Sequence, residues 1–257
     1  MKNRLTTPLV VALLSLFTGN SFAQDSIVRA RKHLWELQSS AGYLYSNEGV
    51  SNGIESWMGV GVRYAFRGYG IGIGMNKLTM AGGQGISELF ITVNAQWKRH
   101  SADFLIGSGG TGSGSSDFGA SRMSVAYAYR LKTHFALCGI YIIDGCSQVT
   151  QTPGTYDMWT NTSTYWEYYF DAQNWRAFAG ARLQHELPVG LFGEFTMMLG
   201  LDHSKYSSET IVSQRTGWTI TSSRSYDAAT RDPVVGLAFA IEAKAGWRLG
   251  RKAGEGK

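Results

Sequence analysis

The tripeptide Asp202-His203-Ser204 contains the three side-chain types of a hydrolytic triad. A histidine can activate a hydroxyl group, and a carboxylate can orient that histidine. Apolar residues precede the tripeptide at period two, which predicts a β-strand whose successive side chains point to opposite faces. We therefore expect Asp202 and Ser204 on one face and His203 on the other. The three residues are catalytic candidates by type, and the spacing does not bring them together.

Charged side chains recur on one face of the predicted strands, opposite a face of large apolar residues. A lipid-facing arginine near the middle of a membrane costs about 2–4 kcal/mol, so the charged face is predicted to line the lumen of a barrel. Basic and acidic residues nearly balance there, which favours an ion-pair network that fills the interior. A narrow passage along the glycines between Gly59 and Gly74 is the alternative. The network is predicted to comprise Glu36, Arg63, Arg67, Glu88, Arg130, Arg176, Arg182, Glu194, Glu242 and Lys244.

The segment 155–170 is unusually rich in aromatic residues with a polar group. Such side chains favour membrane–water interfaces and also binding surfaces. One interpretation is an interfacial girdle with loop packing. The other is an extracellular surface for a sugar, a lipid head group or a host ligand, made by Tyr156, Trp159, Tyr165, Trp166 and Tyr168.

The elements that must position these residues follow from the alternation itself. Residues 122–132 (RMSVAYAYRLK) alternate apolar and small or polar side chains without interruption, as a two-faced strand requires. The same pattern predicts ten strands, at 34–46, 56–67, 69–80, 87–98, 103–112, 119–132, 134–144, 164–185, 190–204 and 234–249. An even count suits a bacterial single-chain barrel, and many of these runs are longer than ordinary strands. A soluble β-sandwich is the competing fold.

The predicted connections alternate between tight turns and longer polar segments, as in barrels with short periplasmic turns and longer extracellular loops. The two longest predicted loops are 145–163 and 205–233. Residues 205–233 have the pattern of a hairpin that turns at Thr216-Gly217. This hairpin would either extend the barrel wall or add two strands to make twelve. Eight strands is a further alternative to ten.

The N-terminus predicts export. Residues 1–23 are predicted to be a cleaved signal peptide, with Lys2 and Arg4 before a short apolar core and small residues at the cleavage site. Residues 24–249 are the predicted barrel, and 250–257 a hydrophilic periplasmic tail. An exported chain can oxidise Cys138 and Cys146. On a straight strand the two cysteines would lie roughly 26 Å apart at about 3.3 Å per residue, so a disulfide needs a fold-back near Gly145.

The mature chain resembles bacterial outer-membrane β-barrel proteins as a class, and no narrower family. The resemblance implies a Gram-negative cell envelope, an outer-membrane location, contact with lipid and lipopolysaccharide, and insertion by the barrel assembly machinery. No basic cluster interleaves with aromatic residues, so nucleic acid is not expected as a partner. No cofactor and no metal site are expected either.

Two function classes follow from the sequence. The favoured one is a non-enzymatic barrel that acts through its extracellular loops or as a narrow, porin-like pore. The alternative is an outer-membrane hydrolase acting on lipid A, phospholipid or peptide, with Asp202, His203 and Ser204 as its candidates.

Overall fold

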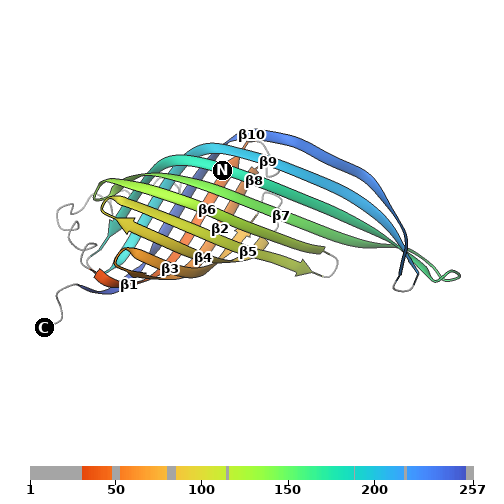
Figure 1. Cartoon of the computed structure of the whole chain (residues 1–257), viewed down its shortest axis with the longest axis horizontal. Helices are drawn as coiled ribbons and strands as arrows, with labels where there is room; N and C mark the ends of the chain where they lie inside the picture. Colours follow the sequence, from red (N-terminus) through yellow and green to blue (C-terminus); the bar gives the residue numbers. More distant parts are fainter. Residues whose placement is uncertain are drawn as a thin grey trace, which may run out of the picture.

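Ten antiparallel strands close into one β-barrel in the computed structural model, which describes residues 31–47, 53–79, 85–113, 116–187, 189–216 and 219–252. Each strand pairs with the next along the chain, and β1 pairs with β10 (Figure 1). The strands are β1 (Arg31–Ser46), β2 (Gly53–Phe66), β3 (Tyr69–Thr79), β4 (Gly85–Trp97), β5 (His100–Ser113), β6 (Ser116–Lys132), β7 (Phe135–Asp157), β8 (Thr162–Glu186), β9 (Leu191–Thr216) and β10 (Thr219–Lys252). The predicted all-β barrel of ten strands is confirmed.

Strict alternation gives the barrel two unlike surfaces. On the outer face Leu89 and Ile91 of β4 expose 65% and 55% of their surface, although both are large and apolar. On the inner face Glu36, Glu88 and Arg176 are each only 2% exposed. In a closed barrel every strand is hydrogen-bonded to a neighbour on both sides, so its backbone can lie in hydrocarbon without unsatisfied polar groups. The apolar surface therefore faces lipid, and the barrel spans the membrane.

One end of the barrel, here called the turn end, holds the short connections and the ends of β1 and β10, which pair there as Arg31 with Lys252. The β2–β3 connection is the two-residue turn Arg67-Gly68, whose φ angles are 49° and 90°. Positive φ at both positions is the hairpin geometry that matches strand twist, and glycine adopts it without strain. The predicted signal peptide lies outside the described residues, and so do residues 253–257 of the predicted tail.

Aromatic side chains mark both edges of the apolar surface. At the turn end the His100 ring stacks on Trp97 at 5.5 Å, and its Nδ1 lies 2.6 Å from the Tyr127 hydroxyl. At the other edge the His203 ring stacks on Trp175 at 4.6 Å. Aromatic rings with a polar group favour the head-group level of a membrane. The two girdles bound the lipid-facing part of the barrel.

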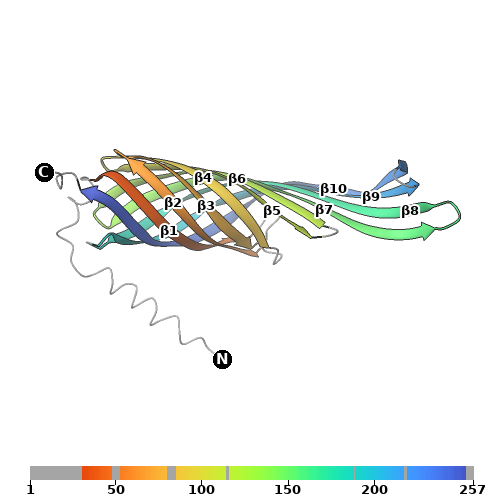
Figure 2. The same cartoon turned by 90° about the horizontal axis from the view of Figure 1, so that it is seen from below.

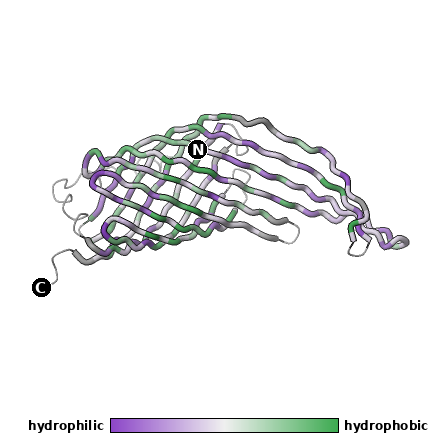
Figure 3. Tube along the Cα trace, viewed as in Figure 1, coloured by the Kyte–Doolittle hydropathy of each residue, from purple (hydrophilic) through white to green (hydrophobic). Residues whose placement is uncertain are grey.

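Four strands continue past the second girdle, where the sequence predicts polar loops. Most of the described residues within 145–163 and 205–233 belong to β7 to β10, which run on as one continuous four-stranded sheet, here called the wall (Figure 2). Thr216 pairs with Thr219, so the predicted hairpin between β9 and β10 is confirmed as an extension of the wall. Figure 3 shows hydrophilic residues gathered at the tip of this extension. The prediction of polar loops was wrong because strands beyond the lipid need no apolar face, and they therefore lack the alternating pattern by which strands were predicted.

No helix among the described residues is long and apolar enough to cross a membrane.

The lipid-facing assignment predicts a penalty for charge at the middle of β4. Ile91→Arg should reduce the free energy of unfolding by about 2–4 kcal/mol in lipid vesicles, measured by urea titration of tryptophan fluorescence. Ser207→Arg is the matched control, because Ser207 is exposed on the same side of the sheet but beyond the girdle. Equal stability of the two variants would contradict a lipid-facing β4.

Candidate functional site

The Arg176 side chain is the centre of a cluster of charged residues at the end of the lumen nearest the wall. Its guanidinium is 2% exposed and forms ion pairs with Glu55 of β2 at 3.0 Å, Asp144 of β7 at 2.9 Å and Asp202 of β9 at 3.3 Å. Asn174 donates a further hydrogen bond of 2.8 Å to Asp144. We call these residues the Arg176 cluster. β2 and β8 are four strands apart around the ring of ten, so the Glu55–Arg176 pair bridges the lumen from one side of the barrel to the other.

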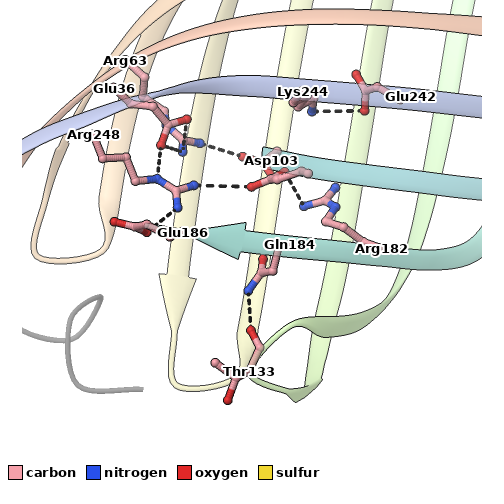
Figure 4. Close-up of polar contacts among 11 residues, drawn as sticks. Glu36, Arg63, Asp103, Thr133, Arg182, Gln184, Glu186, Glu242, Lys244 and Arg248 are labelled. Carbon is pink, nitrogen blue, oxygen red and sulfur yellow. Dashed lines mark hydrogen bonds and ion pairs between the residues drawn. The ribbon is translucent and has the colours of Figure 1, made fainter. Parts of the chain in front are cut away.

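A second network crosses the lumen near the turn end (Figure 4). Glu36 accepts from both Arg63 and Arg248 at 2.8 Å, and Arg248 also reaches Glu186 at 2.8 Å. Charged hydrogen bonds of this length are stronger than neutral ones. The remaining pairs of this network are Arg63–Asp103, Arg248–Glu194, Arg182–Glu194 and Lys244–Glu242.

A cavity of about 340 Å³ lies in the lumen and reaches the turn end, where Thr133 and His185 line it. Toward the wall its lining ends at residues such as Trp57 and Arg176. Asp202, which is directly opposite Arg176 in the β8–β9 ladder, is 1% exposed and does not line the cavity. The Arg176 cluster therefore lies at the end of the cavity on the side of the wall.

Side chains of neighbouring strands occupy the space beside several glycines of β2 and β3. The Phe90 ring occupies the space in which a Cβ of Gly74 would stand, and the side chains of Asn76 and Asn94 do the same for Gly59 and Gly70. Phe90 is 8% exposed. These glycines are therefore places where the side chains of neighbouring strands pack against backbone.

The structure brings most of the predicted lumen residues into contact with a partner of opposite charge. Glu88 differs, because its hydrogen bond comes from the amide of Asn76 at 2.9 Å. Arg130 lines the cavity. Arg67 lies in the exposed β2–β3 turn, with its guanidinium 5.1 Å from the centre of the Phe66 ring.

Two buried carboxylates of these networks lie just outside the predicted strands. Glu55 precedes the predicted strand 56–67 by one residue, and Glu186 follows the predicted strand 164–185 by one residue. Extending each alternating pattern by one position would have found both.

The hydrolytic candidates are divided between the two faces of β9, as the spacing predicts. Asp202 belongs to the Arg176 cluster, and the Ser204 hydroxyl lies 3.4 Å from its Oδ1. His203 stacks on Trp175 on the lipid-facing side. The imidazole cannot reach the serine hydroxyl through the sheet, so this tripeptide does not form a triad.

The two cysteines are free and buried. β7 runs straight through both, with Cys138 opposite Ala128 and Cys146 opposite Ala120 on β6. The fold-back that a disulfide needs is not present between them, and the alternative of a Cys138–Cys146 bridge is wrong.

The wall carries different chemistry on its two sides. On the side continuous with the lipid-facing surface, Glu167 is 8% exposed and accepts from Arg215 at 2.8 Å, Gln151 at 2.5 Å and the Tyr169 hydroxyl at 3.1 Å. The Arg215 guanidinium also lies 4.8 Å from the centre of the Tyr165 ring. This network joins β7, β8 and β9 and stiffens the wall.

The predicted aromatic surface is distributed over three places. Tyr165 lies beside the Glu167 network, whereas Trp166 and Tyr168 lie on the opposite side of β8 and expose 49% and 41% of their surface. Tyr156 and Trp159 lie near the β7–β8 turn at the tip. Tyr226 and Arg224 of β10, which lie in the hairpin predicted for residues 205–233, share a face with Trp166 and Tyr168.

The tip of the β7–β8 hairpin is an ordered turn that presents apolar side chains. Asp157 accepts hydrogen bonds from the Trp159 backbone at 2.9 Å and the Thr160 hydroxyl at 2.8 Å. The bond from Thr160, with that from Trp159, holds the pKa of Asp157 below its usual range. Trp159 and Met158 are 97% and 80% exposed. Protonation of Asp157 weakens these bonds. Their contribution to the stability of the turn is therefore complete at pH values above the ordinary aspartate pKa, and it is lost as the pH falls through the lowered pKa.

The closed barrel, its apolar exterior and its charged interior decide the class of protein. The chain is an outer-membrane β-barrel protein. No family model and no curated protein matches its sequence.

Among solved structures it is similar to BauA, the ferric preacinetobactin receptor from Acinetobacter baumannii, with 10% identity over 84% of this chain and 39% of that chain and a TM-score of 0.37. It is also similar to the β-domain of the Bordetella autotransporter BrkA, with 11% identity over 84% of this chain and 99% of that chain and a TM-score of 0.32. A third is an outer-membrane channel from Pseudomonas putida F1, with 6% identity, 89% and 100% coverage and a TM-score of 0.28. The chain spans about two fifths of the length of the first of these. The matches point to no narrower family.

The Arg176 cluster predicts a large loss of stability when its cation is removed. Arg176→Leu leaves three carboxylates buried without their ion pair and should cost about 3–5 kcal/mol in urea unfolding. Arg224→Gln is the control, since Arg224 is exposed on the wall and its loss should cost less than about 0.5 kcal/mol. An Arg176→Leu barrel as stable as wild type would show that the cluster does not hold the lumen.

Because both thiols are free, we expect two cysteines to be alkylated without prior reduction of the protein. Iodoacetamide should modify Cys138 and Cys146 in urea-unfolded protein that has never met a reducing agent, and should modify neither quickly in the folded barrel, because both are 8% exposed. Mass spectrometry measures the number of adducts. An unfolded chain that takes no label would reveal a disulfide.

Proposed function

We propose that this protein is a non-enzymatic outer-membrane barrel that binds an extracellular ligand through its wall. The observation that carries the proposal is the continuation of β7 to β10 beyond the lipid as an ordered sheet with exposed aromatic residues. The barrel anchors this sheet in the membrane. In outer-membrane barrels the short turns face the periplasm, so we infer that the wall projects from the cell surface.

The lumen supports this proposal over a pore. Two ion-pair networks cross the interior, and the Arg176 cluster buries Glu55 and Asp202 between strands on opposite sides. An aqueous channel would hydrate and screen such charges. Ten-stranded barrels also lie close to the eight-stranded size that side chains can fill.

The positions of the three candidate catalytic residues do not support a hydrolase function. Asp202 is already bound to Arg176, and His203 lies on the far side of the sheet from Ser204. A general base must reach the proton that it abstracts. Lipid A and phospholipids of cells with and without the protein should therefore have identical mass spectra, and a product that His203→Ala abolishes would refute the proposal.

Removing the wall tests the proposal while leaving the barrel intact. Phe170 pairs with Gln148 and Ser208, and Ser208 pairs with Ala229. Replacing residues 149–169 and residues 209–228 each by Asn-Gly closes both hairpins at this level with a two-residue turn. Heat-modifiable migration on gels verifies that the shortened barrel folds.

Cells that display the intact or the shortened barrel are then applied to a printed panel of host matrix proteins, glycans and lipid vesicles. We expect the intact barrel to retain cells on at least one component, and the shortened barrel to lose that binding. Equal retention of both cell types across the panel would contradict a binding function of the wall.

A further inference from the structure

Two rows of side chains cross the wall on the side continuous with the lumen. β8 and β9 pair from Thr162 to Glu186 without a register shift, so the even-numbered residues of β8 stay on the face of Arg176. Directly opposed residues of neighbouring strands share a face. The first row is Thr150, Tyr168, Thr210 and Tyr226, and the second is Thr152, Trp166, Val212 and Arg224.

The aromatic rings of these rows are exposed to solvent and separated from one another along and across the strands. Trp166, Tyr168 and Tyr226 expose 49%, 41% and 40% of their surface. Gly154 makes room for the indole, because a Cβ there would stand 3.2 Å from Trp166 Nε1. Tyr168 and Tyr226 lie on strands two apart, which places their backbones roughly 10 Å from each other with Thr210 between them.

Charge differs between the two sides of the wall. Arg224 is the one charged side chain of the two rows, and its guanidinium lies 5.1 Å from the centre of the Tyr226 ring. The acidic residues Glu167, Asp171 and Glu209 stand at odd-numbered positions of β8 and β9, on the opposite side. A ligand on the aromatic side therefore meets rings, hydroxyl groups and one cation.

We propose that these two rows bind an acidic oligosaccharide. The apolar faces of pyranose rings stack on Trp166, Tyr168 and Tyr226, and the threonine hydroxyls exchange hydrogen bonds with sugar hydroxyls. Arg224 pairs with a carboxylate of the sugar, a charge-assisted contact that neutral saccharides lack. The ring spacing suits two sugars of one extended chain. This inference rests on the proposed function of the wall and specifies its ligand.

Two other occupants fit the wall less well. A lipid chain needs continuous apolar surface, and here the rings alternate with threonines. A peptide strand would add to the free edge of β10, which pairs with β1 only from Ala238 onward. Register shifts interrupt that edge at 220–222, 226–229 and 231–234, and such bulges discourage strand addition.

Titration calorimetry of the full-length mature barrel in detergent micelles tests the inference. The probes are hyaluronan hexasaccharide, which carries a carboxylate on every second sugar, and the neutral hexa-N-acetylchitohexaose, called chitohexaose below. We expect hyaluronan hexasaccharide to bind at least tenfold more tightly than chitohexaose. Trp166→Ala and Tyr168→Ala should each weaken its binding at least tenfold, and Arg224→Gln should make the two affinities equal.

Tyr165→Ala is the matched control, because Tyr165 belongs to the same strand but packs on Arg215 on the opposite side. It should bind the hexasaccharide as wild type does. Absence of binding, unchanged binding in the Trp166→Ala and Tyr168→Ala variants, or an equal loss in Tyr165→Ala would overturn the inference. If the wall-dependent retention of cells persists while no acidic saccharide binds, the ligand class is wrong and the proposed function stands.

Discussion

The ion pair of Arg176 with Glu55 joins opposite sides of the barrel, and its pairs with Asp144 and Asp202 tie it to the neighbouring strands β7 and β9. The arrangement of the lumen depends on these contacts. Each of these charges would be costly inside the barrel without its partner. Together they fill the interior on the side of the wall, where a lumen open to solvent would otherwise begin. The strands can then present a largely apolar surface to lipid, because the charges are placed and neutralised inside. In the proposed function, the interacting surface of the protein is the sheet beyond the membrane.

The wall is made from the same strands as the barrel, and only the side chains change. Along β8 the outward positions pass from Trp175 in the girdle to Gln173 and Asp171 beyond it, while the hydrogen-bonded ladder with β9 continues unbroken. Inside the lipid, alternation separates apolar from charged residues. Outside it, alternation separates a side with the Glu167 network from a side with accessible rings. The first side stiffens the sheet, so the second can hold its rings in fixed positions without a supporting core.

The sequence predicted the barrel, its strand count and most inward charges, because lipid imposes a strong period-two pattern on every spanning strand. Glu55 and Glu186 were missed at strand boundaries, which are the least certain part of a prediction from sequence. The β7–β8 part of the wall was missed for a physical reason: beyond the lipid both faces of a strand meet water, so the contrast between faces disappears. Tyr226 and Arg224 were predicted within the hairpin of residues 205–233, but their approach to Tyr168 and Trp166 follows only from the pairing of β8, β9 and β10.

The central claim is that the Arg176 cluster closes the lumen, and planar-bilayer recording of the purified barrel tests it most directly. The wild-type protein should give no steady conductance across a bilayer into which its insertion has been verified. Arg176→Ala, which removes the bridge between β8 and β2, should give measurable openings in those molecules that remain folded. A large, steady wild-type conductance that Arg176→Ala leaves unchanged would show that the lumen is an open channel, and would contradict the claim that the cluster closes it.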